Sequence, residues 1–212
     1  MPAGTDLVDV LSGPVLDVAP RLLGATLTHD GVAVRLTEVE AYDGANDPGS
    51  HAYRGPTRRT EVMFGPAGHL YVYFTYGMHH CANVVCGEEG RASAVLLRAG
   101  EVVEGVDTAR ARRGRSSERD LARGPARLCQ ALGVDLSANG AVLTEAPGAP
   151  APHLGLGDPL PADRIGTGPR VGLRAAADRP WRFWVEGDPH VSVYRPAAPL
   201  GRRSRDAGRT PR

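Results

Sequence analysis

This sequence of 212 residues contains no lysine, so all 25 of its basic residues are arginines. A chain without lysine offers only its α-amino group for a Schiff base, which argues against covalent imine chemistry. Arginine suits bidentate contacts to phosphate, but a genome rich in G and C also favours arginine codons for reasons unrelated to function. The formal net charge of +1 therefore leaves nucleic-acid binding open and does not establish it.

Cysteine is scarce as well, and long apolar runs are missing. The three cysteines, Cys81, Cys86 and Cys129, are an odd number without a disulfide pattern, which favours a reducing compartment. The N-terminal residues show neither the basic start nor the apolar stretch of a signal peptide, and no segment approaches the length of a membrane span. We expect a cytoplasmic protein that does not act at a membrane.

Glycine (27) and proline (18) are abundant, which predicts many turns and long irregular connections. Periodicity and turn residues predict helices over 17–23, 101–113 and 124–133, and strands over 25–28, 32–42, 70–75, 81–86, 92–97, 181–185 and 191–194. Residues 43–69 and 146–170 are expected to be loops. We therefore predict an α+β fold, a single domain over 1–200 around a mainly antiparallel, curved sheet with flanking helices. A disordered arginine-rich tail is expected over 201–212.

Only 5% of the residues are aromatic, yet four of them fall between Tyr71 and Tyr76. In a strand, Tyr71 and Tyr73 point to one face. They either pack in the core or form a platform for a nucleic-acid base, an interaction worth roughly 1–3 kcal/mol. Tyr76 follows the strand and precedes Gly77, a place from which a side chain can project as a wedge.

Two carboxylates, Glu38 and Glu40, lie in the otherwise apolar run 32–42. Strict alternation would place them on the same face as Val34 and Leu36. A glutamate in such a run either faces solvent at a strand end or is held in a cleft, where it can act as a general base on water. Both interpretations remain open from this feature alone.

The histidines between 51 and 80 raise the question of a zinc site. None lies in a His-x-x-x-His arrangement, and the spacing from Cys81 to Cys86 fits neither a zinc finger nor a zinc ribbon. The glycines of 166–168 do not follow a strand and open a helix, as a phosphate-binding loop would. We expect neither a metal nor another cofactor, although a zinc-dependent hydrolase that uses Glu40 with the histidines remains an alternative.

Several stretches together resemble the alkyladenine (3-methyladenine) DNA glycosylase family, the base-excision enzymes without a helix-hairpin-helix motif. The resemblance extends from about residue 10 to residue 195 and keeps the family's order of motifs. The matching segments are Thr37–Tyr42, Asp47–His51, Arg54–Gly55, Val62–Pro66, Leu70–Asn83, Val95–Ala99, Gly124–Leu132, Arg164–Gly166 and Arg182–Val193. The chain departs from the family pattern at Thr60, in a loop expected to contact the DNA backbone, and at His79-His80 on the expected pocket rim.

The resemblance implies an enzyme that rotates a damaged base out of the duplex and holds it in a pocket. It implies that Tyr76 fills the gap left in the DNA, with Met63 supporting it. Tyr42 would stack on one face of the flipped base, and Tyr73 and His51 would line the other. The clustered aromatic residues would then serve recognition.

The resemblance also implies the chemistry. Glu40 would activate the water that attacks C1′ of the nucleotide, Arg98 would help to position this water, and Val191 would contribute a backbone carbonyl. Asn83 would exclude normal guanine by crowding its 2-amino group. Because the chain lacks lysine, we expect an abasic site in an uncut strand as the product.

The implied function is that of a monofunctional DNA glycosylase that works as a monomer, without a cofactor, on double-stranded DNA of the nucleoid. The implied substrates are 3-methyladenine, 7-methylguanine, hypoxanthine and ethenoadenine. Besides the zinc hydrolase, the other alternative is a non-catalytic nucleic-acid-binding module that keeps the aromatic platform. Glu40 and Arg98 argue against such a module, because binding alone needs neither.

Overall fold

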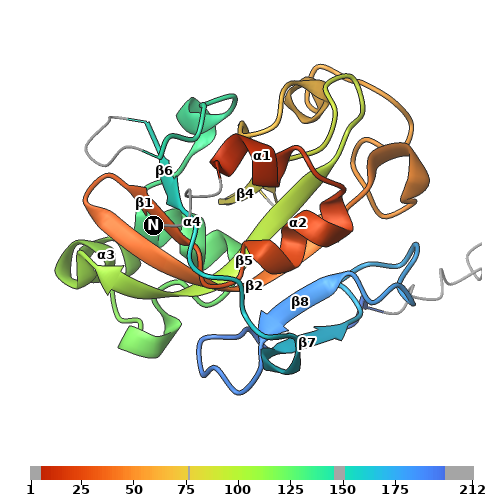
Figure 1. Ribbon diagram of the computed structural model, residues 1–212. Helices are drawn as coiled ribbons and strands as arrows, with labels where there is room; N and C mark the ends of the chain where they lie inside the picture. The colour runs from red at the N-terminus through yellow and green to blue at the C-terminus, as the bar shows by residue number, and fades with distance from the viewer. Residues whose placement is uncertain (1–5, 76, 146–150, 199–212) are drawn as a thin grey trace, which may run out of the picture.

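The computed structural model describes residues 6–75, 77–145 and 151–198, and eight strands in this part of the chain form one sheet (Figure 1). The strand order is β3 (Leu70–Thr75), β4 (His79–Val85), β5 (Ala94–Glu104), β2 (Val32–Tyr42), β1 (Thr26–His29) and β6 (His153–Gly155). The hairpin of β7 (Ile165–Gly168) and β8 (Arg182–Val185) joins this sheet because β8 pairs with β2. These strand pairings are antiparallel. The predicted α+β fold is confirmed.

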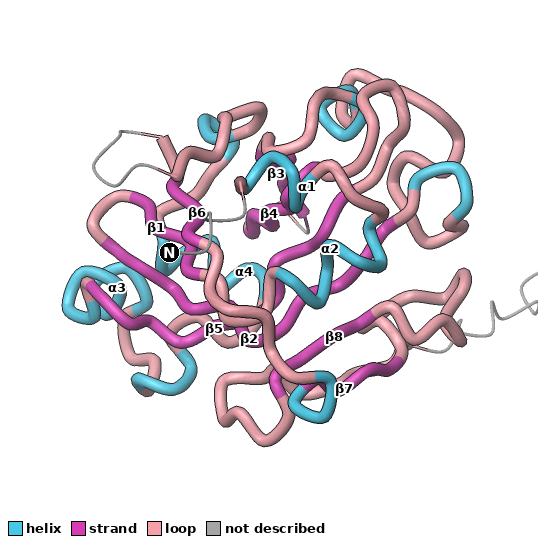
Figure 2. Tube along the Cα trace, viewed as in Figure 1, coloured by secondary structure: helices cyan, strands magenta, loops and turns pink. Residues whose placement is uncertain are grey.

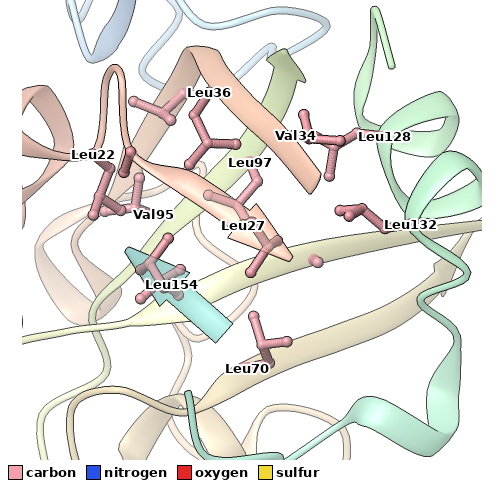
Figure 3. Close-up of a cluster of buried hydrophobic side chains, with 14 of the residues drawn as sticks. Leu22, Leu27, Val34, Leu36, Leu70, Val95, Leu97, Leu128, Leu132 and Leu154 are labelled. Atoms are coloured by element: carbon pink, nitrogen blue, oxygen red, sulfur yellow. The ribbon is translucent and has the colours of Figure 1, made fainter. Parts of the chain in front are cut away.

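In the described part of the chain, four short α-helices accompany the sheet: α1 (Leu7–Leu11), α2 (Val15–Arg21), α3 (Val106–Arg113) and α4 (Pro125–Leu132). Loops make up much of the remaining chain (Figure 2). The hydrophobic core brings together α2, α4 and the central strands, with fully buried leucines such as Leu36, Leu97 and Leu128 (Figure 3). Within the described residues, no helix has the length and apolar character needed to cross a membrane.

Two bulges facing each other change the alternation of β2. The register with β5 runs Leu36↔Gly100, Glu38↔Ala99 and Val39↔Leu97. Thr37 in β2 and Arg98 in β5 are therefore the extra residues, and an extra residue turns the following side chains to the opposite face. The core contains Val32, Val34, Leu36, Val39 and Ala41, so the expectation that Glu38 and Glu40 share a face with Val34 and Leu36 is wrong. The bulge at Thr37 separates these carboxylates from the core.

The predicted helix over 101–113 is wrong in its first part. β5 continues to Glu104 because it stays paired with β2, where Glu101 is the partner of Arg35 and forms an ion pair with it at 2.7 Å. Gly105 then takes a φ of 71°, a left-handed conformation that glycine adopts without steric cost. Helix α3 begins directly after it.

Two predicted segments near the C-terminus are also wrong. Residues 146–170, expected to be a loop, contain β6 and β7, and residues 191–194, expected to be a strand, are irregular. Gly166 belongs to β7 because the indole of Trp184 packs against it, so a Cβ at this position would lie 2.2 Å from the ring. Ser192 binds Glu38 through its backbone N–H at 2.7 Å instead of joining a ladder.

Other elements agree with the sequence analysis. The strands predicted over 32–42 and 70–75 are confirmed at both ends, and α4 begins at Pro125 and ends before Gly133, as expected. Helix α2 lies two residues earlier than predicted, and α1 was not predicted. Tyr76 and the tail 201–212 lie outside the described residues.

Candidate active site

The floor of the candidate site is a row of side chains across five strands. In register, Tyr71 pairs with Asn83, Asn83 with Leu96, Leu96 with Glu40, and Glu40 with Arg182. Residues directly opposite each other in antiparallel strands point to the same face. The sheet therefore brings side chains from distant parts of the chain to one place, and a cavity of about 270 Å³ opens at this row.

Six of the predicted site residues lie in the wall of this cavity: Tyr42, His51, Met63, Tyr73, Asn83 and Arg98. Its volume is close to the lower end of the roughly 300–1,000 Å³ typical of small-molecule sites, a scale that suits a single base. A wider hollow of about 640 Å³ lies elsewhere, between Asp17 of α2 and the turn 87–93. None of its described lining residues is aromatic, so it offers no ring on which a base could stack.

Glu40 lies behind the cavity wall and is held by three residues of that wall. Its Oε1 accepts a hydrogen bond from the backbone N–H of Val171 at 2.6 Å, and its Oε2 accepts one from the Tyr42 hydroxyl at 2.9 Å. Arg98 Nη1 is 3.4 Å from Oε2, and the Glu40 side chain is completely buried. Burial and the neighbouring Glu40 charge raise the pKa of Tyr42, so its hydroxyl keeps its proton and donates.

A second buried carboxylate, Glu38, joins two arginines. Its Oε1 accepts hydrogen bonds from Arg98 Nε at 2.9 Å and Arg182 Nε at 2.7 Å, and its Oε2 accepts the N–H of Ser192. Although burial alone raises the pKa of Glu38, the charges of Arg98 and Arg182 lower it overall. The cluster with Glu40 therefore holds two negative and two positive charges, the balance that buried charges require.

An uncharged aromatic surface forms another part of the wall. The rings of His51 and Tyr73 meet edge to face, with their centroids 4.7 Å apart, and His51 Nδ1 lies 3.3 Å from the Tyr71 hydroxyl. Burial and then the charge of Arg59 lower the pKa of His51, so its ring is neutral near pH 7. Burial raises the pKa of Tyr73. These neutral rings suit stacking with a base.

Tyr42 is supported by a buried ion pair. The guanidinium of Arg170 lies 4.5 Å from the centroid of the Tyr42 ring and 5.1 Å from that of Trp181. Arg170 Nη2 donates to Asp47 Oδ1 at 2.7 Å, Nη1 donates to the carbonyl of Ala41, and both charged side chains are completely buried. Tyr42 is thus held at its ring by a cation and at its hydroxyl by Glu40.

Comparison with known protein families matches residues 9–189 to the family described as methylpurine-DNA glycosylase. The chain belongs to the methylpurine-DNA glycosylase family. Three similar relatives carry the provisional name of 3-methyladenine DNA glycosylase. They come from Streptomyces avermitilis (56% identity, 90% of this chain and 92% of the relative), Frankia casuarinae (54%, 92% and 95%) and Nocardia farcinica (57%, 85% and 88%). The family resemblance predicted from the sequence is confirmed, and with it a DNA-repair enzyme that acts on DNA.

The site of this methylpurine-DNA glycosylase differs from the sequence-based expectation in two residues. The carbonyl of Val191 accepts a hydrogen bond from Arg123 Nε at 2.8 Å, and Val191 is not part of the described cavity wall. Val171 lies in that wall and binds Glu40. Met63 is buried in the wall, and its expected support of Tyr76 stays a prediction. The predicted wedge, Tyr76, lies outside the described residues.

Sequence reasoning missed Val171, the ion pair of Asp47 with Arg170, and the link from Glu38 to Arg182. Asp47 and Arg182 did fall within segments that resemble the family, which was a usable signal, whereas Arg170 and Val171 fell in none. Within the described ranges, no three His, Cys, Asp or Glu side chains gather closely enough to hold a metal ion. The absence of a metal stays a prediction for experiment.

Proposed function

We propose that this methylpurine-DNA glycosylase hydrolyses the bond between a damaged purine and its sugar with a water activated by Glu40. The observation that carries the proposal is the environment of Glu40, a fully buried carboxylate tied to three residues of a base-sized cavity. A carboxylate offers about four acceptor positions, so Oε1, with its single bond from Val171, keeps one for a water. General-base catalysis of this kind is typically worth ~10²–10⁴ in rate.

In the proposed step, Glu40 takes a proton from the water while the water oxygen bonds to C1′. The bond from C1′ to the base nitrogen breaks, and its electron pair leaves with the base. Arg98 helps to orient the water, and Val171 replaces Val191 as the backbone group next to it. Cationic 3-methyladenine and 7-methylguanine leave as neutral molecules, and Glu40 then returns its proton to solvent. Hypoxanthine and ethenoadenine leave as anions that take up a proton from solvent, which balances the one that Glu40 returns. The products are a free base and an abasic site in an uncut strand.

The cavity supports a flipped base as the group that is recognised. Tyr42 would stack on one face of it, and Tyr73 and His51 would contact the other. The substrate would be double-stranded DNA bound by a monomer, with Tyr76 filling the vacated position in the stack. 3-Methyladenine is the base in the names of the relatives, and the other three substrates are inferred from the neutral aromatic walls, which accept any damaged purine that fits.

Release of free hypoxanthine from a duplex, measured with and without EDTA, tests this function. We expect equal rates under both conditions and a strand that breaks only after alkaline treatment of the abasic product. Loss of activity in EDTA, restored by added zinc, would support the zinc hydrolase instead. Binding to the damaged duplex without any base release would support the non-catalytic module.

Asn83→Ser is expected to raise the release of unmodified guanine by roughly 10-fold or more. Asn83 is buried in the cavity wall, and its Nδ2 donates to the carbonyl of Tyr71 at 3.0 Å, so serine removes the amide that would crowd a 2-amino group. Guanine release from undamaged duplex is the measurement. Asn139→Ser is the matched control, because Asn139 binds the backbone of β3 at Val72 but does not line the cavity. If Asn83→Ser still processes hypoxanthine but releases guanine only at the background rate, Asn83 is not the residue that excludes guanine.

A further inference from the structure

We infer that Glu38 is a positioning residue that holds Arg98 away from a two-pronged pair with Glu40 and so keeps Glu40 available to the attacking water. This inference rests on the proposed function, in which Glu40 is the base. Glu38 itself is completely buried and does not line the cavity. Of its described partners, Arg98, Arg182 and Ser192, only Arg98 lines the cavity, so Glu38 would act through Arg98.

The contacts of Arg98 are divided unequally between the two carboxylates. Its Nε donates to Glu38 Oε1 at 2.9 Å with hydrogen-bond geometry, whereas its Nη1 approaches Glu40 Oε2 only to 3.4 Å. Arg182 shares the same oxygen of Glu38 at 2.7 Å. The strong contact of Arg98 is thus with Glu38, and its contact with Glu40 is the loose one.

The planarity of the guanidinium explains why this matters. Once Nε is fixed on Glu38, the directions of both Nη atoms are fixed as well, because the group is a rigid fork. A free guanidinium prefers to meet a carboxylate with two parallel N–H···O bonds. Such a pair would place donors on both oxygens of Glu40, in addition to those from Tyr42 and Val171, and would compete with the water.

The bulges in the sheet are consistent with this role. Arg98 is the extra residue of β5 opposite the step from Glu38 to Val39, and bulges commonly re-aim a side chain next to an active site. The backbone directs Arg98 toward the two glutamates, and Glu38 sets which of its nitrogens reaches Glu40. Ser192 and Arg182 in turn hold Glu38 from the far side.

A double-mutant cycle of Glu38→Gln and Arg98→Met tests the inference, with single-turnover release of hypoxanthine from duplex DNA as the readout. Each single variant is expected to lose roughly 10²-fold in rate. If Glu38 acts through Arg98, the double variant will match Arg98→Met alone, within about threefold, because the group that Glu38 restrains is gone. Affinity for a duplex with an abasic site should stay within about threefold of wild type in all three.

Arg35→Met is the matched control, since Arg35 on the same strand as Glu38 also pairs with a carboxylate, Glu101, but neither lines the cavity nor binds Glu38 or Glu40 among the described ion pairs. Its folded protein is expected to lose less than about tenfold in rate. If Glu38→Gln does not fold, Glu38→Asp enters the same cycle with the same expectation, because its shorter side chain keeps the charge but no longer reaches Arg98 Nε. The inference would be overturned if the losses of the two single variants multiplied in the double variant, or if Arg35→Met lost as much rate as Glu38→Gln. Failure of Glu40 as the base would appear separately, as full activity of Glu40→Gln.

Discussion

Glu40→Gln is expected to reduce the single-turnover release of hypoxanthine roughly 10²–10⁴-fold while leaving the affinity for damaged duplex nearly unchanged. A glutamine amide has almost the same shape as the carboxylate but cannot take a proton from water. Its carbonyl oxygen can still accept the bond from the Tyr42 hydroxyl or the Val171 N–H, so the cavity should keep its form. The measurement is a comparison of base-release rate with the dissociation constant for the same duplex.

Glu101→Gln is the matched control for this prediction. Glu101 lies on β5, is about 39% exposed and pairs with Arg35 on the neighbouring strand, so the same chemical change there removes a charge from the sheet without touching the cavity. We expect a rate within about twofold of wild type, as for most surface changes. Wild-type turnover in Glu40→Gln would show that another group activates the water.

The polar face of β2 shows how far the sequence determines this site. The bounds of the strand and the unusual carboxylates at 38 and 40 could be recognised from residue types alone. The bulge at Thr37 could not, because it depends on pairing with Ala99 and Gly100 of β5, far along the chain from β2. Without it, alternation would have placed both glutamates among the core residues Val34 and Leu36, at a large cost in desolvation.

The support behind Tyr42 could be predicted least. Tyr42 itself falls in a segment that resembles the family, but its partner Arg170 lies in a region whose glycines and prolines indicate a loop. In the structure these glycines make room for Trp184 in the β7–β8 hairpin. The loop between β7 and β8 places Arg170 and Val171 beside β2, where they bind the Ala41 carbonyl and Glu40. Long-range packing of this kind leaves no periodicity in the sequence, so no residue pattern pointed to Val171, and Val191 was expected from the family resemblance alone.

Asp47→Ala is expected to lower the free energy of unfolding by about 3–5 kcal/mol, the usual cost of removing one partner of a buried ion pair. The Arg170 guanidinium would remain fully buried, with only the Ala41 carbonyl and the rings of Tyr42 and Trp181 around it. Chemical denaturation at constant pH measures this loss. In the fraction that stays folded, Arg170 is expected to move from the Tyr42 ring, so base release should fall together with stability.

Asp107→Ala is the control for that experiment, because it also removes an aspartate that pairs with an arginine. Asp107 is about 97% exposed and binds Arg110 at 2.8 Å, and exposed pairs of this kind contribute about 0–1 kcal/mol. Base release in Asp107→Ala should be unchanged. If both variants lose the same small amount of stability, the pair of Asp47 and Arg170 is not what holds Tyr42. The aromatic wall would then depend on its packing and on the hydroxyl bond to Glu40, and Tyr42→Phe, which deletes only that bond, would show the larger loss of activity.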